Sequence, residues 1–282
     1  MNARSWREAS HDPNSRPVVE ARNAAVVAAT RRPVPDRIDW ILQRCRDRRV
    51  IDIGCVDHHV GTHEAATWLH RAIAAVASFC VGVDIEPEGV AAMQAAGYQA
   101  VLHDVCKGPG PIADLDSFDV VVAGEVIEHL PAPQALFDFA AAVLRPGGQL
   151  VISTPNPYAP HRVRAGQLGV AWENADHAVY AFPSGIVELG ERTGFRLEEY
   201  RTVRFRPVAV EVRRGLVKLA VETRDRLTGR SRRHADEDVT LAPALEMRTN
   251  PFELALVALT RSDRLLGETS LYVLRKTGAD SP

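Results

Sequence analysis

The sequence lacks the features that mark several specialised classes of protein. Only 4 of its 282 residues are cysteine, and no two of them form a C-x-x-C pair, so neither a disulfide framework nor a thiolate zinc site is indicated. No stretch reaches the roughly 18 consecutive apolar residues of a membrane span. The first thirty residues contain no apolar segment long enough for a signal peptide. We therefore expect a cytoplasmic protein without a transmembrane segment.

An excess of one charge is also missing. The formal net charge is −2, which argues against a protein that coats nucleic acid in general. Aromatic residues make up only 6% of the chain, whereas hydrophobic residues make up 46% and charged residues 25%. This composition is that of a globular protein with enough apolar residues for one large α/β domain, or for a domain with an additional segment.

What the sequence does contain is an alternation of strand and helix patterns. Ala-rich helical patterns at about 63–78, 86–96 and 132–144 separate short β-branched runs, and RPGG (145–148) is expected to form the turn before the fifth run. The alternation predicts an α/β fold with a doubly wound, mostly parallel sheet, whose ligands bind beyond the carboxyl ends of the strands. The predicted strands are RVIDIG (49–54), FCVGVD (79–84), YQAVLHD (98–104), FDVVVAG (118–124) and GQLVIST (148–154).

Acidic residues stand at the ends of the first four predicted strands, at Asp52, Asp84, Asp104 and Glu125. A carboxylate such as Asp84 suits the two hydroxyls of a ribose, because it accepts two hydrogen bonds at once. Asp104 is placed to accept from an adenine amino group, with the Val105 N–H beside the ring. A dinucleotide site would instead show G-x-G-x-x-G. The acids therefore favour a neutral or cationic nucleoside as ligand.

Five segments in this order resemble the motifs of class I S-adenosylmethionine-dependent methyltransferases, over about residues 48–205. They are VIDIGC, VGVDIE, LHDV, FDVVVAGEVIEHLPAP and LRPGGQLVISTPN. The resemblance implies a seven-stranded Rossmann-like sheet and S-adenosyl-L-methionine as cofactor. It places Asp52 and Gly54 near the methionine part of the cofactor. The full set of cofactor-binding residues that it implies is Asp52, Gly54, Cys55, Asp84, Ile85, Asp104, Val105, Gly124 and Glu125.

The loop after the first strand departs from the family pattern D-x-G-x-G-x-G. Gly54 is kept, but Val56 and His58 stand where the second and third glycines would be. Because this cofactor has no phosphate, we expect one glycine to suffice for the tight turn. The residues that follow could be read as metal ligands, although the polar edge of a pocket is the plainer interpretation. They are Asp57, His58, His59, His63 and His70.

Two histidines are candidates for the chemistry. Methyl transfer to a hydroxyl requires an aligned acceptor and a base for its proton, and histidine suits that task. His129 follows the fourth strand and His177 follows the fifth, where the resemblance implies substrate contacts. We predict Glu128, His129 and His177 as catalytic residues. Asp176 precedes His177 and is expected to orient its ring.

The same residues allow a second interpretation. Small-RNA 2′-O-methyltransferases of this fold carry E-x-x-E-H after the fourth strand and a later histidine, which together bind a divalent ion. Glu125, Glu128, His129 and His177 match this pattern, which also occurs in metal-free relatives, so a Mg²⁺ requirement stays open. Our first interpretation is O-methylation of a hydroxyl on a polar small molecule or sugar. The alternatives are a metal-dependent small-RNA methyltransferase and a non-catalytic binding protein on the same fold.

The segments outside the core have less specific patterns. The N-terminal part is expected to begin disordered and then to form helices at 17–30 and 36–46 over the substrate side. The basic segment 208–233 is either a solvated helix face, a substrate lid, a homodimer contact, a surface for a phosphorylated or lipid-linked acceptor, or a peripheral membrane contact. The predicted division is an N-terminal helical cover (1–47), the methyltransferase core (48–205), a helical basic insertion or lid before the last strand (206–262), and a final antiparallel strand with tail (263–282).

Overall fold

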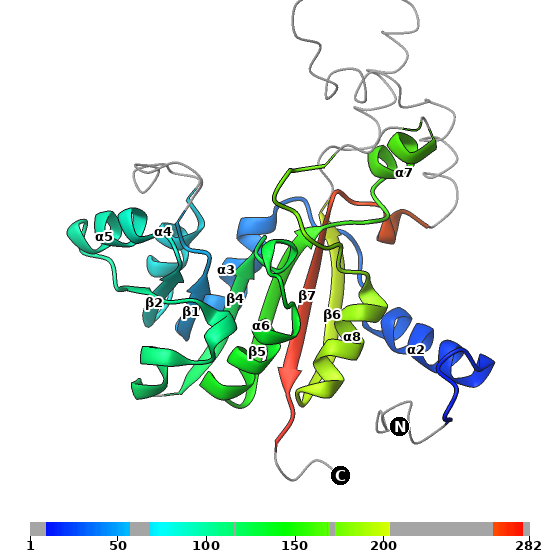
Figure 1. The fold of residues 1–282 in the computed structure, drawn as a ribbon, viewed down its shortest axis with the longest axis horizontal. Coiled ribbons are helices and arrows are strands. Elements are labelled where there is room, and N and C mark those ends of the chain that lie inside the picture. The colour runs from blue at the N-terminus through cyan, green and yellow to red at the C-terminus, as the bar shows by residue number, and fades with distance from the viewer. Residues whose placement is uncertain are drawn as a thin grey trace, which may run out of the picture.

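The computed structural model describes residues 10–56, 68–115, 117–167, 169, 173–203 and 262–278. Its centre is a seven-stranded sheet with the strand order β3-β2-β1-β4-β5-β7-β6 (Figure 1). The predicted basic insertion (206–262) lies outside the described residues, apart from its last position. The strands are β1 (Arg49–Ile53), β2 (Phe79–Asp84), β3 (Ala100–Leu102), β4 (Phe118–Gly124), β5 (Leu144–Pro155), β6 (Phe195–Val203) and β7 (Thr269–Lys276).

The sheet has the predicted mixture of directions. Strands β1 to β5 pair in parallel, and β7 runs antiparallel to both β5 and β6. The strand order reverses at β1, which lies between β2 and β4, and a sheet of this kind binds its ligand at that point. One detail of the prediction was wrong. RPGG (145–148) was expected to be a turn, but it lies inside β5, where the pairing with β4 shifts register.

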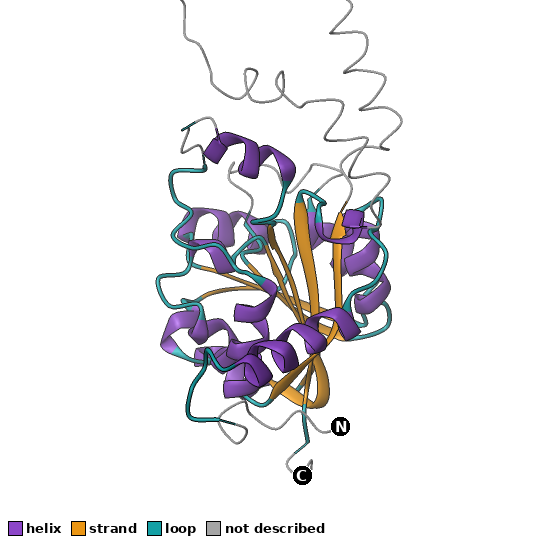
Figure 2. Ribbon diagram, turned by 90° about the vertical axis from the view of Figure 1, so that its right-hand side faces the viewer, coloured by secondary structure: helices purple, strands orange, loops and turns teal. Residues whose placement is uncertain are grey.

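Helices cover both faces of the sheet (Figure 2). Of the predicted helix 63–78, residues 63–67 lie outside the described residues, and the described part forms the short helix α4, after which the chain turns to enter β2. The α-helices are α2 (Arg16–Ala29), α3 (Arg37–Cys45), α4 (Leu69–Ala74), α5 (Pro87–Ala95), α6 (Gln134–Val143), α7 (Pro160–Gln167) and α8 (Pro183–Arg192). The 3₁₀ turns are η2 (Val105–Lys107), η3 (Gly110–Asp114), η4 (Ile127–His129) and η5 (Ser262–Leu265). Among the described helices, none has the length and hydropathy needed to cross a bilayer.

The two N-terminal helices do not both take the expected position over the substrate side. Helix α2 packs against α8 and β6 at the edge of the sheet, where Arg22 forms an ion pair of 2.6 Å with Glu188. The residues after α2 extend this edge through short parallel bridges from Thr30 and Val34 to β6. Helix α3 lies on the other side and reaches the carboxyl ends of the strands through its first residue, Arg37.

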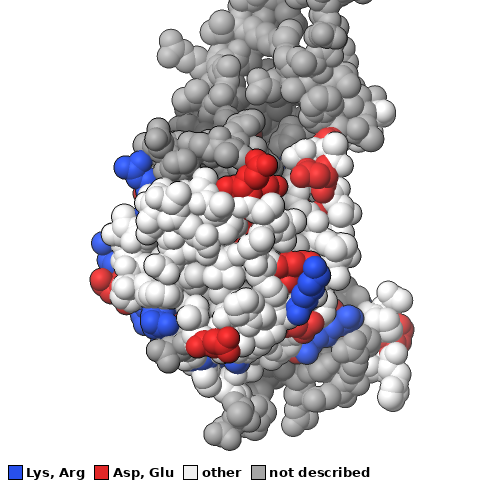
Figure 3. Space-filling model, turned by 60° about the vertical axis from the view of Figure 1, so that its left-hand side comes forward, with Lys and Arg blue, Asp and Glu red and all other residues white. Residues whose placement is uncertain are grey.

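Each face of the sheet has its own apolar layer. Ile51 and Ile53 point from β1 into the layer beneath α6 and α8, whereas Val50 points into the layer beneath α3 and α4. Burying each such side chain stabilises the fold by about 1.5–3 kcal/mol. This packing fixes the strands and therefore the positions of the polar residues at their ends. On the face in Figure 3, charged side chains of both signs are scattered among uncharged ones in the described part of the chain.

Candidate functional site

The turn after β4 builds the centre of the candidate site. Glu125 has a backbone φ of 62°, a conformation that costs a residue other than glycine on the order of 1–3 kcal/mol. Its N–H donates to the Ser153 carbonyl at 2.8 Å, which ties the turn to β5. The strained residue sends the chain directly into η4, which carries Glu128 and His129. Backbone strain at this position is typical of a functional site.

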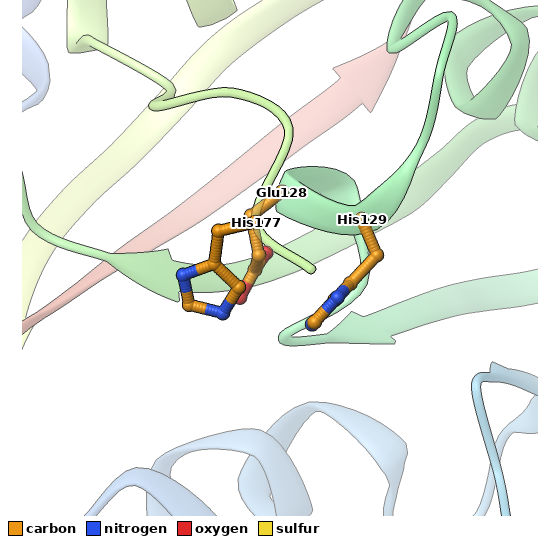
Figure 4. Close-up of side chains that lie close together, drawn as sticks. All are labelled: Glu128, His129 and His177. Atoms are coloured by element: carbon orange, nitrogen blue, oxygen red, sulfur yellow. The ribbon is translucent and has the colours of Figure 1, made fainter. Parts of the chain in front are cut away.

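The structure brings together the three predicted catalytic residues, Glu128, His129 and His177. Their ligand atoms lie within 4.8 Å of one another, and Figure 4 shows the three side chains converging from η4 and a later loop. The two imidazole rings meet edge to face with 4.8 Å between centroids. The loop is held in place by the Ala178 N–H, which donates to the Glu128 carbonyl at 2.7 Å. Glu125 is not in this cluster, although it lines the same pocket.

Glu128 is the buried member of the cluster, with 1% of its surface exposed. Its Oε2 accepts from the Thr154 hydroxyl at 3.0 Å, whereas its Oε1 has no hydrogen-bond partner among the described residues. Burial, and to a smaller extent the nearby Glu125, raises the pKa of the Glu128 carboxyl to about 7. A buried oxygen without a partner is costly unless a cation or a proton donor reaches it.

Both histidines face a carboxylate, but not in the predicted pairing. Asp176 Oδ2 lies 3.0 Å from Nδ1 of His129, so the expectation that Asp176 orients His177 was wrong. The partner of His177 is Glu173, with 3.4 Å between Nδ1 and Oε1. The reason is the turn in which the His177 N–H donates to the carbonyl of Asn174, which separates the two neighbouring side chains. Each ring thus has an acid of the loop beside it, although His177 Nδ1 makes no hydrogen bond to Glu173 among the described residues.

Arg162 of α7 holds the loop that carries Glu173 and His177 through hydrogen bonds. The Arg162 guanidinium donates to both carboxylate oxygens of Glu173, at 2.8 and 3.2 Å, and its Nε also donates to the Tyr180 hydroxyl at 2.9 Å. Burial alone would raise the pKa of Glu173, but the hydrogen bond and the charge of Arg162 lower it below its usual value. The side chain of Glu173 beside His177 is therefore a carboxylate at neutral pH.

These elements enclose a polar cavity of about 300 Å³. In the segment after β5, the rings of Tyr158 and Phe182 meet at 5.5 Å between centroids, with 38% and 46% of these residues exposed. Trp172 of the same segment lies outside the described residues. The cavity is lined by Glu125, Glu128, His129, Pro155, His161, Arg162, Asn174, His177, Glu268 and Thr269.

The predicted nucleoside contacts occupy neighbouring strand ends. The Val56 and Glu86 N–H groups donate to the two oxygens of Asp84, at 2.8 and 3.0 Å. Burial raises the pKa of Asp84 despite these bonds. Ile85, which follows it, is 70% exposed and offers an apolar surface for a flat ring. Asp104 accepts from the Cys106 N–H at 2.9 Å and so begins η2 at the end of the next strand.

Other predicted cofactor residues turn their side chains inward. The side chains of Asp52, Cys55 and Val105 are buried, which leaves mainly their backbone groups for a cofactor. Gly54 has a φ of 71°, and a Cβ there would lie 2.5 Å from Val126 Cγ2, so this glycine is required. His70, expected at the edge of the pocket, is instead buried and bonded to Asp52. The remaining residues of that predicted polar edge lie outside the described residues: Asp57, His58, His59 and His63.

Sequence reasoning missed one residue at the centre of the site. Arg37 donates from Nη1 to the Ser153 hydroxyl at 3.0 Å, and the same nitrogen lies 3.5 Å from where a Cβ on Gly124 would be. This places a cation at the carboxyl ends of β4 and β5. No motif surrounds Arg37 in the sequence, because only the packing of α3 against α4 and β4 brings it there.

The comparisons with known proteins agree with this architecture. A family model described as a methyltransferase domain matches residues 27–200. The ubiquinone biosynthesis O-methyltransferase of Aeromonas salmonicida is 27% identical over 194 residues, which cover 64% of this chain and 78% of that protein. The enzyme of the same name from Coxiella burnetii is 27% identical over 188 residues, 63% of this chain and 76% of the relative.

Similar solved structures include a SAM-dependent methyltransferase from Archaeoglobus fulgidus, with 16% identity, a TM-score of 0.49, and coverage of 90% of this chain and 94% of that one. An S-adenosylmethionine-dependent methyltransferase from Mesorhizobium loti has 18% identity, a TM-score of 0.44, and coverage of 85% and 95%. The family match spans more than half of the chain and includes β1 to β5 with their acidic ends. The chain therefore belongs to the methyltransferase-domain family, and it is an S-adenosylmethionine-dependent methyltransferase.

Proposed function

We propose that the protein transfers the methyl group of S-adenosylmethionine to a hydroxyl oxygen of a polar small molecule or sugar. The observation that carries this proposal is the cluster of Glu128, His129 and His177 at the carboxyl ends of the strands. Carboxylates and imidazoles orient and deprotonate a hydroxyl, whereas methyl transfer from this cofactor needs no further activation. Two curated relatives whose names describe O-methylation support the same reaction.

The cofactor would lie across the ends of β1, β2 and β4. Asp84 would accept from the ribose hydroxyls, and the exposed Ile85 would lie against the adenine. Gly54 and Gly124 let the chain pass close to the methionine part. Arg37 would meet the methionine carboxylate, because it is the cation that the fold brings beside Gly124. This arrangement directs the methyl group towards the polar cavity.

One imidazole of the cluster would act as the base. The acceptor hydroxyl would give its proton to His129 or His177 as the oxygen attacks the methyl carbon, and the sulfur would leave as the thioether. A carboxylate beside each ring, Asp176 or Glu173, would stabilise the imidazolium that forms. The cavity of about 300 Å³ has room for a monosaccharide-sized group.

A divalent cation such as Mg²⁺ fits the donors of this site. Glu128 Oε1 is a buried oxygen without a partner among the described residues, and two imidazoles lie beside it. Glu125, which lines the same cavity, would supply a further carboxylate. With the ion bound, one imidazole would ligate it and the other would remain the base. The ion would lower the pKa of the acceptor hydroxyl and align a second hydroxyl next to it. A vicinal diol is therefore the acceptor that we favour.

The test is methyl transfer from labelled S-adenosylmethionine to a panel of glycans, phenols, carboxylates and small RNAs, followed by mapping of the methylated atom. We expect product on an oxygen of a small hydroxylated acceptor. Methylation of nitrogen or carbon would overturn the proposal, and transfer to RNA alone would favour the small-RNA alternative. A folded sample that gives no heat with S-adenosylmethionine or S-adenosylhomocysteine would favour a non-catalytic role.

A further inference from the structure

A buried carboxylate lies behind the cofactor loop, on the wrong side for a ligand. Side chains alternate along a strand, so Asp52 points to the same face of β1 as Val50, into the apolar layer beneath α3 and α4. Only 2% of Asp52 is exposed. A carboxylate in such a place is costly unless it is paired. Its partner is His70 at the start of α4, with 3.0 Å between Nδ1 and Oδ2.

The ring of His70 is held from several sides. Trp68 and Tyr98 contact it with 5.3 and 5.6 Å between ring centroids. Below it lies Gly82 on β2, where a Cβ would be only 3.1 Å from the imidazole Cε1 and 2.5 Å from Cys55 Sγ. The glycine therefore makes the space that the ring and the thiol occupy. The Nε2 of His70 has no hydrogen-bond partner among the described residues, so the ring is committed to Asp52 alone.

Trp68 reaches the same loop at a second point. Its indole Nε1–H donates to the Cys55 carbonyl at 2.8 Å, and this bond is fully buried. A third bond, from the Val56 N–H to Asp84, joins the loop to the end of β2. The chain from Asp52 to Val56 is thus fixed at three points.

We propose that Trp68 and His70 are positioning residues for cofactor binding: they brace the loop after β1 from behind. The family pattern uses further glycines in this loop, whereas this chain has Val56 and His58 at those positions. The two side chains would not touch the cofactor. They would hold Gly54 and the neighbouring peptide groups in the binding-competent conformation. A loop that is ordered in the free protein loses less entropy on binding, and apparent affinity scales with the population of the competent conformation.

The experiment compares two Trp→Phe substitutions, each of which removes the indole N–H donor of a buried tryptophan. Trp68→Phe removes the bond to the Cys55 carbonyl and keeps an aromatic ring. The matched control is Trp40→Phe, because Trp40 is also buried and donates from Nε1 to Glu199 at 3.1 Å, away from the loop. We expect Trp68→Phe to raise the Kd for S-adenosylhomocysteine about three- to tenfold in calorimetry, the effect of one hydrogen bond. Trp40→Phe should stay within about twofold of the wild type, even where both lower the Tm.

Hydrogen exchange separates bracing from general core packing. In free Trp68→Phe the amides of Gly54 and Val56 should exchange faster than in the wild type, and saturating S-adenosylhomocysteine should remove most of the difference. In Trp40→Phe these amides should be unchanged. His70→Asn keeps a hydrogen-bond donor near Asp52 and should retain the affinity for S-adenosylhomocysteine that His70→Phe loses. This second pair of variants tests the proposal if Trp68→Phe fails to fold.

Equal Kd values for the two tryptophan variants, or unchanged exchange at Gly54 and Val56, would overturn the proposal. The proposal concerns cofactor binding and does not depend on the acceptor or the metal. The titration of the wild type with S-adenosylhomocysteine is therefore its reference. A wild type that binds the cofactor but methylates no hydroxyl would contradict the proposed function and leave the brace testable.

Discussion

Asp176 Oδ2 lies 3.0 Å from Nδ1 of His129, and this contact joins the loop between α7 and α8 to the turn after β4. The same loop supplies His177 and its own partner, Glu173. One loop thus carries one ring of the cluster and a carboxylate for each ring. The surroundings of both imidazoles therefore depend on the position of this loop, which Arg162 of α7 fixes through its hydrogen bond to Glu173.

We expect Asp176→Ala to lower kcat about 10- to 100-fold while leaving the KM for S-adenosylmethionine unchanged, because the carboxylate orients His129 without reaching the cofactor. Asp176→Asn keeps an acceptor oxygen and should recover part of the loss. The exposed Asp39 gives a surface control, Asp39→Asn, with wild-type rates. A kcat equal to that of the wild type in Asp176→Ala would show that the contact between Asp176 and His129 has no part in the reaction.

Asp84→Ala should weaken binding of S-adenosylmethionine by about 1.5–3 kcal/mol, the scale of hydrogen bonds to a charged group. The measurement is calorimetric titration with S-adenosylhomocysteine. The exposed Glu88, in the first turn of α5, provides the control Glu88→Ala, which should bind as the wild type does. Unchanged affinity in Asp84→Ala would mean that the carboxylate at the end of β2 does not hold the ribose.

How far the sequence predicted this site depends on the kind of information involved. The strands and the acids near their ends are local patterns, so Asp84 ends β2 as predicted, and Asp104 follows β3 by two residues as the N-cap of η2. The meeting of Glu128, His129 and His177 was predicted through the family resemblance. In contrast, Arg37 reaches Ser153 only through tertiary packing. The partners of the two histidines depend on a turn that no motif marks, which is why Asp176 was assigned to the wrong ring.

Glu128 gives a prediction for stability against pH. Its pKa is raised to about 7 in the folded protein, mainly by burial, so the folded state holds the proton more tightly than the unfolded state between pH 4.5 and about 7. The free energy of unfolding of the metal-free protein should therefore fall as the pH rises through this window, by up to about 3 kcal/mol. Glu128→Gln cannot ionise and should lack this fall.

Urea unfolding of both proteins at about pH 5 and pH 8 in chelator tests this prediction. Relative to the wild type, Glu128→Gln should be more stable at the higher pH than at the lower one. The same stability difference between the two proteins at both pH values would contradict a carboxyl that is protonated in the folded state near neutral pH.

The last prediction concerns the divalent ion. Removal of metal with a chelator should abolish methyl transfer to a diol acceptor, and Mg²⁺ or Mn²⁺ should restore it, because carboxylate and imidazole ligands accept both ions. Binding can be measured apart from activity, by titrating Mn²⁺ into the chelator-treated protein and following its paramagnetic signal. The wild type should bind one ion. Glu128→Gln should bind at least about tenfold more weakly, because it loses the buried carboxylate whose Oε1 has no partner among the described residues. Affinity for S-adenosylhomocysteine should be the same in both proteins, since Glu128 faces the acceptor side. Full activity in chelator, together with no Mn²⁺ binding, would leave the two histidines as bases without a metal and would favour acceptors with a single hydroxyl.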